Sequence, residues 1–175
     1  MKVVILMGGK SHRMGKDKAL VTYRGQTLLE SAVKLAKQID EEFYLSLSHE
    51  QFETFGHEYR CIIDAVADRG PLVGISSALV YLREDILVIP IDMPNITIDI
   101  LEQLIASGKT SAYQVKHWIQ ALPSYWSFKD IGNIQHALNN DLLNLKSFFE
   151  ENVNLIPFNG DEKIFLNVNR PEDLK

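Results

Sequence analysis

The sequence has a single cysteine, Cys61, among its 175 residues. One cysteine cannot form an internal disulfide, which excludes disulfide-stapled secreted folds and suits a reducing cytoplasm. Cys61 stands in an apolar run, so we expect it to pack in the core. The five histidines are scattered, with no pair four residues apart and no cysteine cluster, which argues against a zinc site. No G-x-S-x-G motif occurs, so a serine hydrolase is not indicated either.

Excess positive charge and long apolar runs are also missing. The net charge of −5 argues against a general nucleic-acid binder, which would be basic overall. The first apolar run covers only residues 3–7, too short for a signal peptide or a membrane span. We therefore expect a cytoplasmic protein without nucleic-acid or membrane partners. Its length is sufficient for one sizeable core, and we expect one domain over residues 1–175.

The segment with the clearest pattern is residues 2–18, KVVILMGGKSHRMGKDK. A short β-branched run that ends at Gly8 and Gly9 predicts a buried strand followed by a tight turn. Glycine lets the backbone approach a ligand, and the N–H groups of such a turn form a concavity for anions. Four nearby cations then favour a polyphosphate ligand: Lys10, Arg13, Lys16 and Lys18.

Two well-known phosphate loops do not account for this segment. A Walker loop needs Ser or Thr where this chain has Asp17, and the dinucleotide fingerprint G-x-G-x-x-G is absent. The alternative to a phosphate loop is a glycine turn with a solvated basic face.

Strand and helix patterns alternate through the first two-thirds of the chain. This alternation predicts an α/β fold, with a three-layer, open, mostly parallel, Rossmann-like sheet. The expected strands are 3–7, 43–47, 59–63 and 86–91, and the expected helices 28–39, 49–55, 72–82 and 98–105, the last capped by Thr97. The last third predicts strands 112–115, 119–128 with a break at Pro123, 153–158 and 164–168, and helices 131–138 and 142–151. We expect a nucleotide-binding part over about 1–110 and an acceptor-binding part over about 111–175.

Two aspartates are expected at the edge of this sheet where ligands bind, beyond the carboxyl ends of the strands. Asp92 follows the most apolar strand, and there it can hold Mg²⁺ together with triphosphate oxygens. The alternative is an aspartate that only caps a loop. Asp64 follows another strand and can contact base, ribose or metal, or can simply form a turn.

Two further segments carry candidate binding residues. Gly70 and Gly74 flank a loop that leads into a helix, and they allow a flat base to approach the backbone. The alternative is a simple start of a helix with a tightly packed Gly74. Asn167 and Asn169 fall on one side of an expected extended segment, where they can contact a ligand or complete a magnesium shell. Arg170-Pro171 is then expected to begin a terminal helix.

These segments together resemble a known family, the molybdenum cofactor guanylyltransferases. Residues 6–20 resemble its L-x-G-G-x-S-x-R-M-G-x-D-K signature, residues 70–74 its G-P-L-x-G loop, residues 90–94 its magnesium motif and residues 167–174 its N-x-N-T-P-E-D-L tail. The motifs occur in the family's order. The Gly-Gly pair and the Asn-x-Asn tail resemble the guanylyl branch more than the cytidylyl branch.

The resemblance implies transfer of GMP from GTP to the phosphate of molybdenum-molybdopterin, with Mg²⁺ as cofactor and with molybdoenzyme-maturation proteins as possible partners. It implies catalytic roles for Arg13, Lys18 and Asp92, with Asp92 also the metal ligand, and contact of Asn167 and Asn169 with the acceptor. The nucleotide would be bound by Leu6, Met7, Gly8, Gly9, Lys18, Ser46, Asp64, Gly70, Gly74 and Asp92. Ser46 departs from the asparagine that is frequent at its position. The alternatives are a cytidylyltransferase or other nucleotidyltransferase of the same fold, and a non-catalytic nucleotide-binding regulator.

Overall fold

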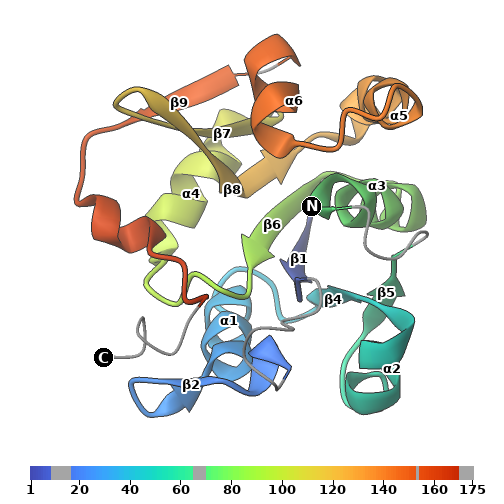
Figure 1. Cartoon of the computed structure of the whole chain (residues 1–175), viewed down its shortest axis with the longest axis vertical. Helices are drawn as coiled ribbons and strands as arrows, with labels where there is room; N and C mark the ends of the chain where they lie inside the picture. Colours follow the sequence, from blue (N-terminus) through green and yellow to red (C-terminus); the bar gives the residue numbers. More distant parts are fainter. Residues whose placement is uncertain (9–16, 65–69, 153, 170–175) are drawn as a thin grey trace.

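A seven-stranded sheet runs through the computed structural model, which describes residues 1–8, 17–64, 70–152 and 154–169 (Figure 1). The strand order is β5–β4–β1–β6–β8–β7–β9. β8 is antiparallel to β6 and β7, and all other neighbours are parallel. The expected open, mostly parallel α/β sheet is thus confirmed. Its strands are β1 (Lys2–Leu6), β4 (Tyr44–Leu47), β5 (Cys61–Ile63), β6 (Ile86–Pro90), β7 (Ser111–Val115), β8 (Trp118–Trp126) and β9 (Asn154–Phe158).

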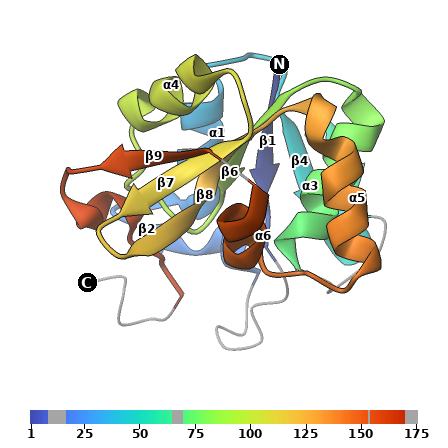
Figure 2. The ribbon, with the colours of Figure 1, turned by 90° about the horizontal axis from the view of Figure 1, so that it is seen from above.

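Helices cover both faces of the sheet and make three layers (Figure 2). One face packs against α1 (Leu28–Ala36), α2 (His49–Phe55) and α4 (Ile98–Ser107). The other face packs against α3 (Pro71–Leu82), α5 (Ile131–Asn139) and α6 (Leu145–Asn152). A small hairpin of β2 (Thr22–Tyr23) and β3 (Gln26–Thr27) precedes α1. None of the helices in the described ranges is long and apolar enough to cross a membrane.

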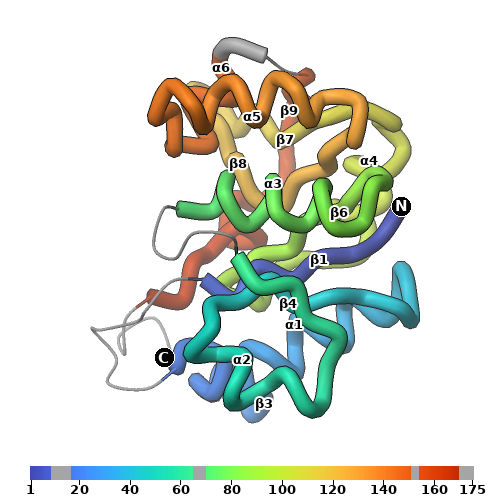
Figure 3. Tube along the Cα trace, turned by 90° about the vertical axis from the view of Figure 1, so that its right-hand side faces the viewer, coloured from blue at the N-terminus to red at the C-terminus, as the bar shows by residue number. Residues whose placement is uncertain are grey.

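The central position of β1 explains its unbroken apolar run. Val3, Ile5 and Met7 belong to the core on the α1 side, while Val4 and Leu6 belong to the core on the α3 side. All five side chains are at most 7% exposed. Figure 3 shows β1 between α3 and α1. Burying each such side chain stabilises the fold by about 1.5–3 kcal/mol, so this strand anchors the segment that follows it.

Local hydrogen bonds explain where several helices begin. Thr27 Oγ1 accepts from the Glu30 amide, and the Glu30 carboxylate accepts from the Thr27 amide, so these two residues form a capping box at the start of α1. Ser48 and Gln51 form the same arrangement at α2. Thr97 precedes α4 as expected, but its side chain makes no capping hydrogen bond.

The last third of the chain corrects three expectations. β8 continues through Pro123 instead of breaking there. Proline cannot donate a backbone hydrogen bond, but the pairing of β8 with β7 is irregular in this region and its pairing with β6 stops at Ser124, so the strand tolerates it. The helix expected from residue 142 begins at Leu145, where the Asn144 side chain accepts from the Lys146 amide. At Pro123 the strand pairing outweighs the local pattern, whereas at Leu145 a local hydrogen bond sets the start of the helix.

The third correction concerns residues 164–168, which form no strand. A 3₁₀ turn (Glu162–Phe165) begins where the Asp161 carboxylate accepts from the Lys163 amide. This turn brings Phe165 against Tyr113 and Phe158, with ring centroids 5.6 and 4.8 Å away. Aromatic packing therefore replaces the expected pairing of an edge strand.

Candidate active site

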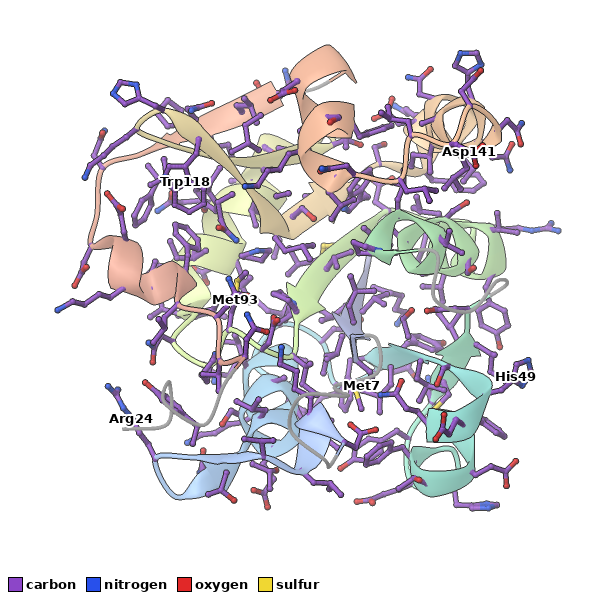
Figure 4. All side chains as sticks on the ribbon, in the orientation of Figure 1. Met7, Arg24, His49, Met93, Trp118 and Asp141 are labelled. Atoms are coloured by element: carbon purple, nitrogen blue, oxygen red, sulfur yellow. The ribbon has the colours of Figure 1, made fainter. Side chains whose placement is uncertain are left out.

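The tips of β1 and β6 leave the sheet side by side. Leu6 pairs with Pro90, and the Ile91 amide donates to the Leu6 carbonyl at 3.1 Å. Gly8 and Asp92 therefore follow adjacent strands at the carboxyl edge, where Figure 4 labels Met7 and Met93. Gly8 has φ +76°, a left-handed conformation that favours glycine. The glycine turn and the carboxylate expected to face it lie on the same rim of the sheet.

The side chain of Lys18 connects this rim to the end of the described chain. Its ammonium donates to Asp92 Oδ2 at 2.8 Å and to Asn169 Oδ1 at 2.5 Å. The Lys18 and Asp92 side chains are only 11% and 24% exposed. The Val168 amide also donates to the Asp92 carbonyl at 2.8 Å. Three segments that are distant in sequence thus meet around one cation.

The position of Lys18 depends on a residue that the sequence reasoning did not place in the site. Asp17 Oδ1 accepts from the Ala19 amide at 2.9 Å, which starts the 3₁₀ turn Lys18–Leu20. Asp17 Oδ2 accepts from the Gln51 side chain on α2 at 3.1 Å. Asp17 therefore holds the backbone of Lys18 against α2. The signal in the sequence was an aspartate directly before a short apolar turn, which is a common cap.

A second polar cluster lies at the tips of β4 and β5. Ser46 is 2% exposed, and its hydroxyl donates to Asp64 Oδ1 at 2.6 Å. Burial raises the pKa of Asp64, and the hydrogen bond from Ser46 offsets part of this rise. A Cβ on Gly74 would lie 2.9 Å from Ser46 Oγ and 3.1 Å from Asp64 Oδ1. Gly74 is thus tightly packed against Ser46 and Asp64. This agrees with the alternative stated for residues 70–74, the start of a helix with a tightly packed Gly74.

The two aspartates follow strands that are not neighbours in the sheet. β5 and β6 are separated by three strand spacings in the sheet order, or about 14 Å. Asp64 and Asp92 therefore stand at different strands of the same edge, and the role of Asp64 as a contact to base, ribose or metal stays a prediction. Gly70, which has φ +87° and precedes α3, begins the helix that carries Gly74.

The remaining predicted site residues are partly or fully buried or lie outside the described residues. Gly9, Arg13 and the segment from Arg170 lie outside the described residues, so their roles stay predictions. Asn167 is half-buried beside Val168, in a stretch without regular structure rather than in the expected extended strand. Leu6 and Met7 are almost fully buried, which leaves their backbone as the part that a ligand could contact.

The donor set at the rim suits a hard cation. Carboxylate and amide oxygens of Asp92 and Asn169 already surround one positive charge, and such oxygens are the ligands that Mg²⁺ prefers. Within the described ranges, no three His, Cys, Asp or Glu residues group closely enough to hold a metal. A metal here would therefore take its remaining ligands from a substrate and from water.

Comparison with known proteins identifies the family. Residues 3–150 match the family model described as the MobA-like NTP transferase domain. The chain belongs to this family. Like its members, this MobA-like protein carries a nucleotidyltransferase fold.

Two curated relatives and one solved structure illustrate the likeness. A molybdenum cofactor guanylyltransferase of Polynucleobacter asymbioticus is 28% identical over 98% of this chain and 92% of its own length. One of Xanthomonas euvesicatoria pv. vesicatoria is 34% identical over 61% of this chain, a match that spans about half (54%) of that relative. The structure of molybdopterin-guanine dinucleotide biosynthesis protein A from Archaeoglobus fulgidus aligns with a TM-score of 0.82, at 23% identity, over 99% of this chain and 95% of that one. This last likeness supports the fold.

Proposed function

We propose that this MobA-like protein transfers GMP from GTP to the phosphate of molybdenum-molybdopterin and releases pyrophosphate. The observation that carries the proposal is the meeting of Lys18, Asp92 and Asn169 beside the Gly8 turn. This arrangement provides a cation for phosphates and oxygen ligands for a metal at one edge of the sheet. The names of the curated relatives support guanylyl transfer as the reaction.

The reaction needs positioning and charge neutralisation more than proton transfer. The acceptor phosphate is already ionised near neutral pH, so it can attack the α-phosphorus of GTP without a general base. A new bond forms between its oxygen and the α-phosphorus, the bond to the β-phosphate oxygen breaks, and pyrophosphate leaves with that electron pair. Lys18 lies where it can neutralise charge that develops on the triphosphate, which is the main form of catalysis for such a transfer.

Mg²⁺ is the cofactor that we propose for this site. Asp92 would hold it directly, and Asn169 supplies a neighbouring oxygen. When bound, the ion would withdraw negative charge from the nucleotide oxygens. The proposed setting is the cytoplasm, where molybdoenzyme-maturation proteins would receive the product.

Pyrophosphate release tests the proposed function. The protein is mixed with Mg²⁺, molybdenum-molybdopterin and either GTP or CTP. We expect release with GTP and little with CTP, and a loss of about a hundredfold or more in Asp92→Asn, as for removal of a group that stabilises transition-state charge. Asp99→Asn is the matched control, because Asp99 is exposed in the first turn of α4.

Each alternative function has its own outcome in this assay. Release with CTP but not GTP would replace the proposal with cytidylyl transfer. Nucleotide binding without release from either triphosphate would support a non-catalytic regulator.

A further inference from the structure

β5 forms one edge of the sheet, between α3 and α2 (Figure 1). Its hydrogen bonds to β4 use alternate residues, since the Arg60 carbonyl accepts from β4 and the Asp64 amide donates to it. The backbone N–H and C=O groups of Cys61 and Ile63 therefore point away from β4. Among the described residues, no strand pairs with β5 on this outer side. An edge of this kind can accept another strand.

The two edges of the sheet differ in how they are protected. β9, at the far edge, carries Pro157, a residue that interrupts strand pairing because it has no N–H donor. β5 carries neither proline nor lysine, and consists of Cys61, Ile62 and Ile63. Because β5 is only three residues long, its hydrogen bonds alone would hold a partner weakly, and a stable complex needs further contacts.

An apolar groove beside this edge offers such contacts. The groove has a volume of about 640 Å³ and lies between β5, one flank of α3 and the end of α5. Val73, Ser76 and Val80 follow one another along the α3 flank at helical spacing. Val80 and Tyr81 also line the groove, and they are 50% and 65% exposed. Exposed apolar residues that cluster in this way mark interaction sites, where tyrosine is enriched.

The length and register of β5 fit a second copy of the same strand. When two such edges pair antiparallel around a two-fold axis at Ile62, Cys61 of each copy lies opposite Ile63 of the other. Each of these pairs can exchange two backbone hydrogen bonds, because both residues point their N–H and C=O groups outward. A shift by two residues in either direction would move one residue of a pair outside β5. The strand is therefore complementary to itself in this register.

The same register brings opposite charges together. Arg60 precedes β5 and Asp64 follows it, so Arg60 of each copy lies opposite Asp64 of the other. The Arg60 side chain is 55% exposed, and its contact with Glu42 uses one guanidinium nitrogen, which leaves donors for a second carboxylate. An ion pair at the rim of an interface sets the register more than it adds affinity.

The groove continues this fit on the α3 side of the sheet. The two-fold axis keeps both α3 helices on the same face and turns them antiparallel. Gly74 lies beside Asp64, two residues along the chain from Ile62. Two strand residues span about 6.6 Å, which equals about four residues of helix, so the axis passes near Ala78. Tyr81 of each copy then lies level with the amino-terminal half of α3 of the other copy, which lines that copy's groove.

We infer that two copies of this chain form a dimer through this edge: their β5 strands pair antiparallel around Ile62, and Tyr81 of each copy covers the groove of the other. The dimer is isologous, and one sheet continues through both copies. Because β5 is short, we expect a dissociation constant in the micromolar range. The inference does not depend on the proposed reaction, since Asp92 follows β6, three strands away from β5.

Sedimentation analysis at protein concentrations from micromolar to near millimolar tests the inference. The mass of the wild type should rise from 19.9 kDa in dilute solution to twice that value. Tyr81→Glu puts a charge into the groove and should weaken association by about thirtyfold, as for loss of an interface hot spot. A wild type that stays at 19.9 kDa throughout would overturn the inference and leave the groove to a different partner.

Leu20→Glu is the matched control for the added charge. Leu20 is 52% exposed and does not line the groove. We expect this variant to associate as tightly as the wild type. If Tyr81→Glu associates as tightly as Leu20→Glu does, or if both variants are equally weakened, the copies do not meet at this groove and the inference is wrong.

A single cysteine at the two-fold axis tests the register. With Ile62→Cys on a Cys61→Ser background, the two Cβ atoms lie about 5 Å apart across the axis, close to disulfide distance. In the wild type, the Cα atoms of the two Cys61 residues lie about 9 Å apart, which is too far for a bridge. We expect mild oxidation to cross-link the Ile62→Cys protein and to leave the wild type uncross-linked.

The cross-linking result is read after a check of folding. Ile62 is buried, so urea unfolding of the reduced protein establishes that the Ile62→Cys protein is folded. Equal cross-linking of both proteins, or cross-linking of the wild type alone, would contradict the register around Ile62. If the variant does not fold, the comparison of Tyr81→Glu with Leu20→Glu decides the inference.

Discussion

Replacing Lys18 by methionine removes the charge that links Asp92 and Asn169 at the rim and keeps a side chain of similar length. Its ammonium hydrogen-bonds Asp92 and Asn169, and it is only 11% exposed. The substitution leaves the Asp92 carboxylate without this partner. Loss of a fully buried pair costs about 3–5 kcal/mol and of an exposed pair less than 1, so this partly exposed pair should cost about 1–2 kcal/mol of unfolding free energy.

The same substitution should have a larger effect on GTP. Loss of an ammonium–phosphate contact weakens binding by about thirtyfold. At a GTP concentration one hundred times the wild-type Kd, bound ligand stabilises the wild type by about 2.7 kcal/mol. With a thirtyfold weaker Kd, the same concentration stabilises Lys18→Met by only about 0.9 kcal/mol.

Urea unfolding with and without GTP and Mg²⁺ measures both effects in one series. Lys37→Met serves as control, since Lys37 is exposed at the end of α1. We expect the control to match the wild type in both measurements. Equal stabilisation of Lys18→Met and wild type by GTP would refute the reasoning that this ammonium faces the triphosphate.

Three further predictions concern other parts of the molecule. Burial raises the pKa of Asp64, so the charged form of this carboxylate opposes folding above that pKa. Asp64→Asn should therefore raise the urea midpoint at pH 7 but weaken GTP binding. The wild type should lose GTP affinity as acid protonates Asp64, and the variant should not show this loss. Burial raises the pKa of Asp85, but hydrogen bonds from the Phe128 amide, Tyr125 and other donors outweigh it and lower the pKa below the ordinary value. Asp85 therefore stabilises the fold fully above its ordinary pKa of about 4, and this stabilisation is lost as pH falls through the lower pKa of the folded state. In urea unfolding from pH 6 to pH 2, the free energy of unfolding should depend less on pH in Asp85→Asn than in the wild type. Trp126→Ala should cost about 3–5 kcal/mol in urea unfolding, because Trp126 is fully buried at the amino edge, and should leave the GTP Kd unchanged.

The elements with strong local signals were predictable. The apolar run 3–7 has no alternation, which matches a strand covered by helices on both faces. The Thr27 capping box marks the start of α1 to the residue. Asp92 could be placed on the rim beside Gly8 because both follow parallel strands, and ligands gather at that edge in such sheets.

The contacts that complete the site could not be predicted from local patterns. Lys18 and Asn169 are 151 positions apart, and no periodicity relates them. The Ser46–Asp64 hydrogen bond depends on strand order, and the tight approach of Gly74 depends on how α3 packs over that pair. The turn at Glu162–Phe165, where the pattern predicts a strand over 164–168, could not be predicted locally because Phe165 packs in part on Tyr113, about fifty positions earlier.

The most direct test of the central claim is the effect of Mg²⁺ on GTP affinity, measured by calorimetry in the wild type and in Asp92→Asn. We expect Mg²⁺ to strengthen GTP binding to the wild type, and this gain to be almost absent in the variant because its neutral amide holds the ion poorly. An equal gain from Mg²⁺ in both proteins would contradict a metal site at Asp92 beside the Gly8 turn.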